Sequence, residues 1–283
     1  MSMTTIQWYP GHMAKAKRKI IESLKLVDAV IELRDARIVA SSANPDIDKI
    51  CGDKPRLILL NKYDLADDKV NNMWISTLRK KNIEVLLTNS MTGQGLNKIK
   101  PALNNLLKEK LDRLQAKGIQ NYTIRVMVVG IPNVGKSSFI NRVAKSKRTI
   151  TGDRPGVTKS NQWIKTKEDI ELLDTPGVLW PKFEDEKVGL DLAFTGAIKD
   201  EIMNIEDLAY KLIEVLQEEY PDRLKERFKL DEVSDDPLVN MENMALKRGA
   251  ILKGREIDYT RIATILLDEF RGGKLGKISL ERP

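Results

Sequence analysis

The feature that most constrains the fold is a segment that runs from Gly130 to Ser137. It matches G-x-x-x-x-G-K-[ST], a loop whose backbone N–H groups surround phosphate groups. Residues 122–129 before it are apolar and β-branched, which predicts a short buried strand. Residues 137–144 after it place apolar side chains at helical spacing, without Pro or Gly. Strand, glycine-containing loop and helix are the context that this motif needs, so we predict an α/β sheet.

Each position of the loop motif has a chemical role. Gly130 and Gly135 allow the backbone to turn its N–H groups toward a polyphosphate at the positive end of a helix dipole. Lys136 is expected to reach the β- and γ-phosphates, and Ser137 to bind Mg²⁺. The loop therefore predicts a site for a nucleoside triphosphate rather than an ordinary turn. The expected nucleotide contacts in it are Asn133, Val134, Gly135, Lys136, Ser137 and Ser138.

The composition limits the classes of protein to which the chain can belong. Its 283 residues can bury a real core and are enough for two domains. The net charge of +7 favours a polyanionic partner, although only modestly. The single Cys51 excludes an intrachain disulfide framework and fits a reducing compartment. Since no apolar run approaches the ~20 residues of a membrane span, and the N-terminus resembles neither a signal peptide nor an Arg- and Ser-rich leader, a cytoplasmic protein without membrane contact is expected.

A second motif, N-K-x-D, covers residues 61–64 at the end of an expected strand over 56–60. The carboxylate of Asp64 can accept hydrogen bonds from N1–H and the 2-amino group of guanine. Adenine has an acceptor at N1 and no 2-amino group, so it would leave a buried carboxylate unpaired, which is costly. The stem of Lys62 can lie over the base, and Asn61 can connect this loop with the phosphate loop. Beside a phosphate loop, N-K-x-D indicates a guanine nucleotide.

A weaker signal follows the next expected strand, over residues 83–88. Asn89 and Ser90 come directly after this strand, where a backbone N–H or a side chain could contact the base from its other edge. An ordinary loop between a strand and a helix explains these residues equally well. Both alternatives stay open at the level of sequence.

Two segments after the phosphate loop are expected to sense the γ-phosphate. Residues 145–159 are polar and contain Gly and Pro, which is typical of a switch segment that becomes ordered on nucleotide binding. Thr158 within it is expected to meet Mg²⁺ and the γ-phosphate, unless it is an uninvolved loop residue. Asp174, after an expected strand over 170–173, should hold Mg²⁺ through water, and the N–H of Gly177 should meet the γ-phosphate.

The motifs occur in a rotated order. N-K-x-D, G-x-x-x-x-G-K-S, a switch threonine and D-T-P-G are the recognition boxes of the translation-factor-like GTPases, but here the base-recognition boxes precede the phosphate loop. This order resembles the circularly permuted GTPases. Within them, residues 8–16 (W-Y-P-G-H-M-A-K-A) and residues 131–137 (I-P-N-V-G-K-S) closely resemble the bacterial ribosome biogenesis GTPase A family, also called RbgA or YlqF. The similarity extends over essentially the whole chain.

The motif order and the helical pattern of the second half together predict two domains. Residues 1–178 are expected to form a GTPase domain. It begins with a basic helix over 13–26, which is followed by a P-loop GTPase sheet with circularly permuted motif order. Residues 179–283 are expected to form a small all-helical domain. Because the γ-phosphate sensor leads directly into this domain, its pose should depend on the nucleotide. Other helices are expected over residues 70–81, 96–117, 187–197, 205–219, 222–228, 237–248 and 259–270.

The resemblance implies a function and a partner. Members of this family act on the large ribosomal subunit, so the chain is expected to be a monomeric assembly factor that binds a late 50S precursor, contacts 23S rRNA and ribosomal proteins, and is released on GTP hydrolysis. The alternative is a GTP-gated rRNA-binding module in which hydrolysis is incidental. Basic residues of the helical half could contact RNA phosphates or be solvated surface charges. They are Lys225, Arg227, Lys247, Arg248, Lys253 and Arg255.

The catalytic group is the least determined part of the site. Ras-like enzymes place a Gln directly after D-x-x-G to orient the attacking water, and here that position is Val178. The resembled family also has a hydrophobic residue there, and the histidine of the opening motif is proposed as its catalytic group, which corresponds to His12. A lone histidine beside Trp8 could instead pack or contact RNA phosphate. The resemblance also implies that Asn133 helps to bind K⁺ beside the phosphates; otherwise it stabilises its own turn.

Overall fold

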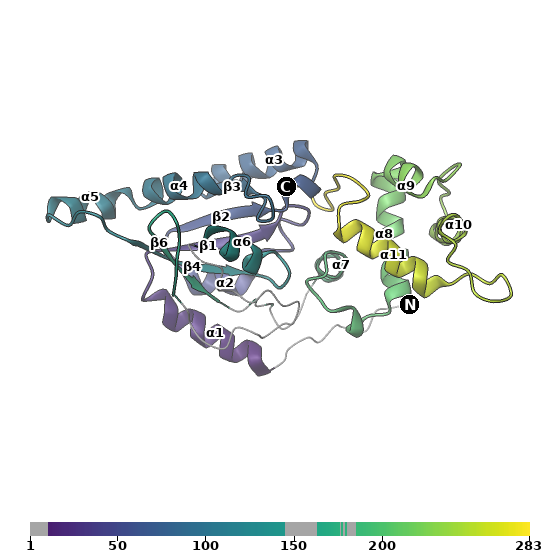
Figure 1. Ribbon diagram of the computed structural model, residues 1–283, viewed down its shortest axis with the longest axis horizontal. Helices are drawn as coiled ribbons and strands as arrows, with labels where there is room; N and C mark the ends of the chain where they lie inside the picture. Colours follow the sequence, from purple (N-terminus) through teal and green to yellow (C-terminus); the bar gives the residue numbers. More distant parts are fainter. Residues whose placement is uncertain (1–10, 145–162, 176, 178, 180–184) are drawn as a thin grey trace. The chain divides into compact units, whose positions relative to one another are not determined.

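The computed structural model describes residues 11–144, 163–175, 177, 179 and 185–283, with the backbone alone for residues 11–17 and 202 (Figure 1). The chain divides into two compact units. The first unit comprises Met1–Glu184 together with Glu281–Pro283, and the second comprises Asp185–Leu280. The division therefore falls at 184/185, whereas the sequence placed it at 178/179, and residues 281–283 group with the first unit.

A sheet forms the centre of the first unit (Figure 1). Its strands are β1 (Ala29–Asp35), β2 (Arg56–Asn61), β3 (Glu84–Thr88), β4 (Ile124–Gly130), β5 (Trp163–Lys165) and β6 (Ile170–Asp174). They lie in the order β3-β2-β1-β4-β6-β5, and all neighbours are parallel except β5 and β6. Every residue of β1 is buried, as expected for a central strand of a parallel sheet that is covered on both faces. The α/β class predicted from the sequence is confirmed.

The register of the sheet brings the sequence motifs to one edge. Asn61 at the end of β2 lies opposite Asp35 of β1 and Thr88 of β3. Gly130 at the end of β4 lies opposite Leu33 of β1. After β3 the chain crosses to the other side of β1 to form β4, so the direction of strand order reverses between β1 and β4. The crevice beyond the carboxyl ends of strands at such a switch point is where open α/β sheets bind ligands.

One predicted helix of the first unit is wrong. The described helices are α1 (Gly11–Leu24), α2 (Pro45–Cys51), α3 (Asp68–Lys80), α4 (Ile99–Leu106), α5 (Lys108–Ala116) and α6 (Lys136–Val143). The single helix expected over 96–117 starts instead as a 3₁₀ turn, Leu96–Lys98. The α-helix begins only at Ile99, because proline is tolerated in the first turn of an α-helix and Pro101 must therefore lie there. It breaks again at buried Leu107 (φ −104°, ψ 12°), beyond which α5 buries no residue.

The second unit is helical in its described residues, as predicted. Its helices are α7 (Glu186–Phe194), α8 (Ile205–Glu219), α9 (Pro221–Phe228), α10 (Pro237–Arg248) and α11 (Tyr259–Arg271). The starts of these helices follow from capping residues that are visible in the sequence: the Asn204 side chain accepts hydrogen bonds from two backbone N–H groups of α8, and Asp236 caps α10. Pro221 and Pro237 occupy first-turn positions, where the missing N–H costs nothing.

Glu269 of α11 holds two of the basic residues that the sequence assigned to RNA. Arg227 donates to Glu269 through Nε and Nη2, at 2.8 and 2.6 Å. Arg248 donates to both carboxylate oxygens through Nη2, at 3.2 and 3.1 Å. These pairs connect α9 and α10 to α11. The side chains of Lys225, Lys247, Lys253 and Arg255 are exposed.

Glu281 follows the second unit in the chain and contacts residues of the first unit. One of its carboxylate oxygens accepts a hydrogen bond from Ala40 N at 2.7 Å, and the other accepts from Ser41 N at 2.9 Å and from the Ser41 hydroxyl. The indole N–H of Trp74 in α3 donates to the Glu281 carbonyl at 3.4 Å. Glu281 is 9% exposed, so its charge is offset mainly by these donors. We call this contact the Glu281 clasp.

We expect Glu281→Gln to destabilise the first unit by roughly 1–3 kcal/mol, because an amide presents one acceptor oxygen where the carboxylate presents two. Urea denaturation followed by tryptophan fluorescence measures this, since Trp8, Trp74, Trp163 and Trp180 are the only tryptophans and all belong to the first unit. The control is Glu232→Gln, which changes an exposed acid of the second unit. Equal midpoints for the two variants would show that the clasp contributes nothing.

Candidate nucleotide-binding site

The loop between β4 and α6 requires glycine at both ends of its motif. Gly130 has φ +154°, and a Cβ built on it would lie 2.7 Å from the Leu33 carbonyl oxygen of the neighbouring strand. Gly135 has φ +101°, and a Cβ there would lie 2.4 Å from Nδ2 of Asn61. Both positions thus combine a backbone conformation that favours glycine with a close neighbour. The second glycine makes room for a residue of the N-K-x-D motif.

Asn61 joins three loops through its side-chain amide. Its Nδ2 donates to the Val134 carbonyl of the phosphate loop at 2.8 Å. Its Oδ1 accepts from Ser90 N at 3.0 Å and from Ser90 Oγ at 2.8 Å. Asn61 is 1% exposed, so these bonds form away from water, where a broken one would be costly. The base-recognition segments and the phosphate loop therefore form one structure.

Lys62 and Asp64 are arranged as a guanine site requires. Lys62 has φ 58°, and its Nζ donates to the Asn133 carbonyl of the phosphate loop at 2.8 Å. Oδ1 of Asp64 is buried and accepts no hydrogen bond within the described part of the chain. A buried carboxylate oxygen without a partner is rare in native proteins. The N1–H and 2-amino group of guanine would supply the missing donors.

The ammonium group of Lys136 lies against the loop that is expected to bind phosphate. Its Nζ donates to the carbonyl oxygens of Gly130 and Ile131, at 3.0 Å each. Burial lowers the pKa of Lys136 from 10.5 to about 8, and nearby Asp174 opposes that change. A Cβ on Gly177 would lie 2.9 Å from this Nζ and 3.1 Å from the Cα and N atoms of Pro132, so the D-T-P-G segment passes close to both the lysine and the backbone of the phosphate loop. A phosphate oxygen would provide the counter-charge that two carbonyl dipoles provide only in part.

The donor set fits Mg²⁺. Asp174 ends β6 and is 7% exposed; burial raises the pKa of its carboxyl group, and the charge of Lys136 opposes this. Ser137 is exposed at the start of α6, one residue after Lys136. Hydroxyl and carboxylate oxygens are the ligands that Mg²⁺ prefers. The described residues contain no cluster of three or more His, Cys, Asp or Glu, so the other ligands would be phosphate and water, as is usual for Mg²⁺.

Several expected site residues are not tested by the geometry. Thr158 and Val178 lie outside the described residues. The backbone of His12 belongs to the first turn of α1, but its side chain is not described, so its role stays a prediction. Asn89 uses its side chain within its own loop, where Oδ1 accepts from Met91 N at 2.8 Å and Thr92 N at 2.9 Å.

The sequence analysis missed two residues beside the site. Asp35 is the last residue of β1 and Arg37 lies two positions later; both were treated as part of a polar loop, yet both are 1% exposed. Asp35 contacts Lys62, with Oδ2 at 3.0 Å from Nζ. The available signal was a pair of opposite charges at the carboxyl end of an expected strand, at the edge of the sheet where ligands bind.

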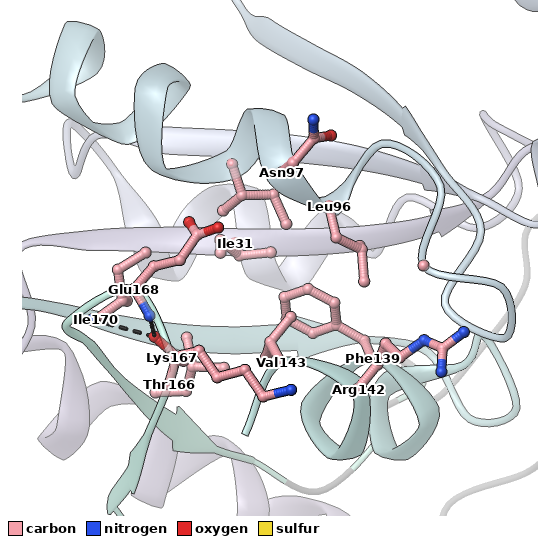
Figure 2. A pocket seen from close by; sticks show the side chains of 13 residues that line it. Ile31, Leu96, Asn97, Phe139, Arg142, Val143, Thr166, Lys167, Glu168 and Ile170 are labelled. Atoms are coloured by element: carbon pink, nitrogen blue, oxygen red, sulfur yellow. Dashed lines mark hydrogen bonds between the residues drawn. The ribbon is translucent and has the colours of Figure 1, made fainter. Parts of the chain in front are cut away.

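A separate cavity of about 250 Å³ lies behind α6 (Figure 2). Figure 2 shows Phe139 and Val143 of α6, Ile31 of β1 and Leu96 around it, with Arg142 at one side. Its lining includes none of the motif residues named above. This largely apolar space lies among α6, residues 96–99 and the turn between β5 and β6, apart from the sequence motifs.

The nucleotide-free protein is expected to become more stable as the pH rises from about 8 to about 10. The pKa of Lys136 is about 8 in the folded protein, against 10.5 for an ordinary lysine, so the unfolded chain binds more protons in this interval and the free energy of unfolding increases with pH. The full shift corresponds to on the order of 3 kcal/mol. Denaturation across this pH range would measure it, and Lys136→Met should flatten the curve. Identical pH dependence in parent and variant would contradict the assignment.

Known proteins resemble this chain over its whole length. Residues 125–243 match a family model described as 50S ribosome-binding GTPase. Ribosome biogenesis GTPase A of Bacillus cereus is 51% identical over 98% of this chain and 94% of its own, and mitochondrial ribosome-associated GTPase 1 of Bos taurus is 34% identical over 98% and 88%. The crystal structure of GNP-bound YlqF from T. maritima, 28% identical, has a TM-score of 0.66 and covers 95% of this chain and 98% of its own. The chain is a GTPase, and it belongs to the ribosome biogenesis GTPase A family.

Proposed function

We propose that the protein is an assembly factor that binds a late precursor of the large ribosomal subunit with GTP bound and leaves it when GTP is hydrolysed. The observation that carries the proposal is the buried Oδ1 of Asp64, which has no hydrogen-bond partner among the described residues and lies beside a phosphate loop, in a chain 51% identical to a ribosome biogenesis GTPase A. The matching family model is itself described as ribosome-binding. A guanine site and a ribosomal partner are thus supported by independent observations.

The residues of the site have separate tasks in this proposal. Asp64 reads the guanine edge, while Asn61 fixes the distance between base and phosphates through Val134 and Ser90. Lys136 exchanges its two carbonyl contacts for the β- and γ-phosphates. Mg²⁺ held by Ser137, Asp174 and Thr158 would neutralise phosphate charge. The other expected contacts are Asn89, Asn133, Gly135, Ser138 and the Gly177 N–H.

His12 is proposed to orient the attacking water, because Val178 offers no hydrogen-bonding side chain where Ras-like enzymes use Gln. An imidazole can accept or donate a proton near neutral pH. The backbone of His12 lies in the first turn of α1, the helix that precedes the sheet in the chain. In this proposal the ribosomal subunit brings this helix to the nucleotide, so turnover is expected to be slow without the subunit.

The second unit is proposed to contact rRNA phosphates. Lys225, Lys253 and Arg255 are exposed and are the better candidates, since Arg227 and Arg248 already share Glu269 and exposed Lys247 pairs with Asp231. The protein is proposed to act as a monomer in the cytoplasm. No described helix has the length and apolarity to cross a membrane.

Val178, the residue after D-T-P-G, has no side chain that can orient the attacking water. A second function, in which hydrolysis is not essential, is therefore also a candidate. In this alternative the protein is a GTP-gated rRNA-binding module, the nucleotide sets its affinity for the subunit, and turnover is incidental. Subunit binding that needs GTP but tolerates the loss of His12, with normal release, would favour it.

Purified large subunits are expected to stimulate GTP turnover of the parent protein, and His12→Ala should lose roughly a hundredfold or more of the stimulated rate. GTP affinity and subunit binding should be unchanged. Arg18→Ala, which removes an exposed charge from the same helix, is the control and should keep the rate at saturating subunits. If His12→Ala is stimulated like the parent, His12 is structural. If subunits stimulate neither protein, the gated-binder alternative replaces the assembly GTPase.

K⁺ is proposed to bind at Asn133 and to supply positive charge beside the phosphates in place of an arginine finger. Turnover should therefore be faster in K⁺ than in Na⁺. Asn133→Ala should remove the difference by slowing the K⁺ rate to the Na⁺ rate, while the affinity for GDP stays close to that of the parent. Equal rates of the parent in the two salts would refute the role of K⁺.

A further inference from the structure

We propose that Asp35 is a positioning residue for the guanine base: its carboxylate holds the ammonium group of Lys62 where the lysine stem can cover the base. The proposal rests on the guanine site proposed above. Asp35 belongs to neither the phosphate loop nor N-K-x-D, and it reaches the site because the last residue of β1 pairs in register with Asn61, the residue before Lys62.

Asp35 is a buried charge whose position is fixed by a guanidinium group. Arg37 donates from Nε to Oδ1 and from Nη2 to Oδ2, at 2.9 Å each, and its backbone N–H donates to Oδ1 at 3.1 Å. This two-point contact defines the orientation of the carboxylate as well as its place. The backbone N–H of Asp35 donates to Ser42 Oγ at 3.1 Å, which secures the residue from the loop side.

The same carboxylate serves a second cation. Its Oδ2 lies 3.0 Å from Nζ of Lys62, so one carboxylate stands between two positive groups. Burial alone would raise the pKa of Asp35, but the charges of Arg37 and Lys62 hold it well below its usual range. Burial lowers the pKa of Lys62, Asp35 opposes this, and Arg37 adds to it. Without Asp35, Lys62 would be a desolvated cation next to the uncompensated charge of Arg37.

The ammonium of Lys62 also reaches the phosphate loop. Nζ donates to the Asn133 carbonyl at 2.8 Å while it contacts Asp35. These two contacts fix the ammonium group, while 26% of the side-chain surface of Lys62 stays exposed. If the carboxylate is lost, the ammonium gains more by moving into water, and it takes the stem away from the base and releases the loop carbonyl.

An alternative role for Asp35 is structural only. In that case it neutralises Arg37 and stabilises the turn after β1, and the contact with Lys62 has no consequence for the nucleotide. The two roles differ in one measurable respect. Only a positioning role makes the effect of changing Asp35 depend on the presence of Lys62.

The test is a double-mutant cycle on GDP affinity, with Asp35→Asn, Lys62→Met and the combination, measured with fluorescent GDP. Asp35→Asn should weaken binding about tenfold or more, and the combined variant should bind no more weakly than Lys62→Met alone. Additive losses would overturn the proposal. If Asp35→Asn does not fold, Asp35→Glu replaces it in the cycle, because glutamate keeps the charge but moves it. The supporting result and the contradicting result stay the same.

Asp28 provides a matched control at the other end of β1. It is 8% exposed, pairs with Lys110, and accepts hydrogen bonds from Tyr122 Oη at 2.9 Å and Arg125 N at 2.8 Å. Asp28→Asn removes an equivalent buried charge far from the motifs, so it should lower the melting temperature and leave the GDP affinity within about twofold. A loss of affinity equal to that of Asp35→Asn would show general destabilisation and overturn the proposal.

One further variant separates this inference from the guanine site on which it rests. Xanthine has a carbonyl where guanine has the 2-amino group, so Asp64→Asn, with its amide donor, should shift the preference from GDP to xanthosine diphosphate. If this preference does not shift, the guanine site fails and the role of Asp35 fails with it. If the preference shifts but Asp35→Asn binds GDP normally, only the role of Asp35 is overturned.

Discussion

The site depends on one side-chain amide. Asn61 has a donor and an acceptor on a single rigid plane, and it uses the first on the phosphate loop and the second on the segment after β3. These segments are separated in sequence by 73 and 29 positions from Asn61. A carboxylate of the same size would lack the donor, and a leucine would lack both. The N-K-x-D segment, the phosphate loop and the segment after β3 are therefore joined by contacts within the protein itself.

The rotated motif order leaves the sheet unchanged but alters what each motif is attached to. The crevice beyond β1 and β4 is formed by parallel strands whose order does not depend on where the chain begins. In this chain, however, the Asp174 and Gly177 segment is followed directly by the helical unit. In the proposed mechanism, a change at the γ-phosphate would act on a segment that precedes the helical unit directly in the order of the motifs.

Local signals predicted much of the fold, and long-range contacts were out of reach. The helices over 205–219 and 237–248 were placed correctly because Asn204 and the Asp236–Pro237 pair mark their starts. The break at Leu107 carries no Gly or Pro, so periodicity alone joined two helices. In the site, motif spacing located Asn61, Lys62 and Asp64, whereas Asp35 had no motif to identify it. Its importance follows from strand register, which a single sequence does not reveal.

The Glu281 clasp also has a consequence for how the protein is made. Its carboxylate completes a loop 240 residues earlier in the chain, so the ribosome has to synthesise the whole second unit before the first one gains its last contact. Domains otherwise begin to fold from the N-terminus during synthesis. Until Glu281 emerges, the N–H groups of Ala40 and Ser41 have only water as an acceptor. A chain that terminates prematurely within the second unit consequently leaves the loop after β1 without the carboxylate that accepts from Ala40 N and Ser41 N.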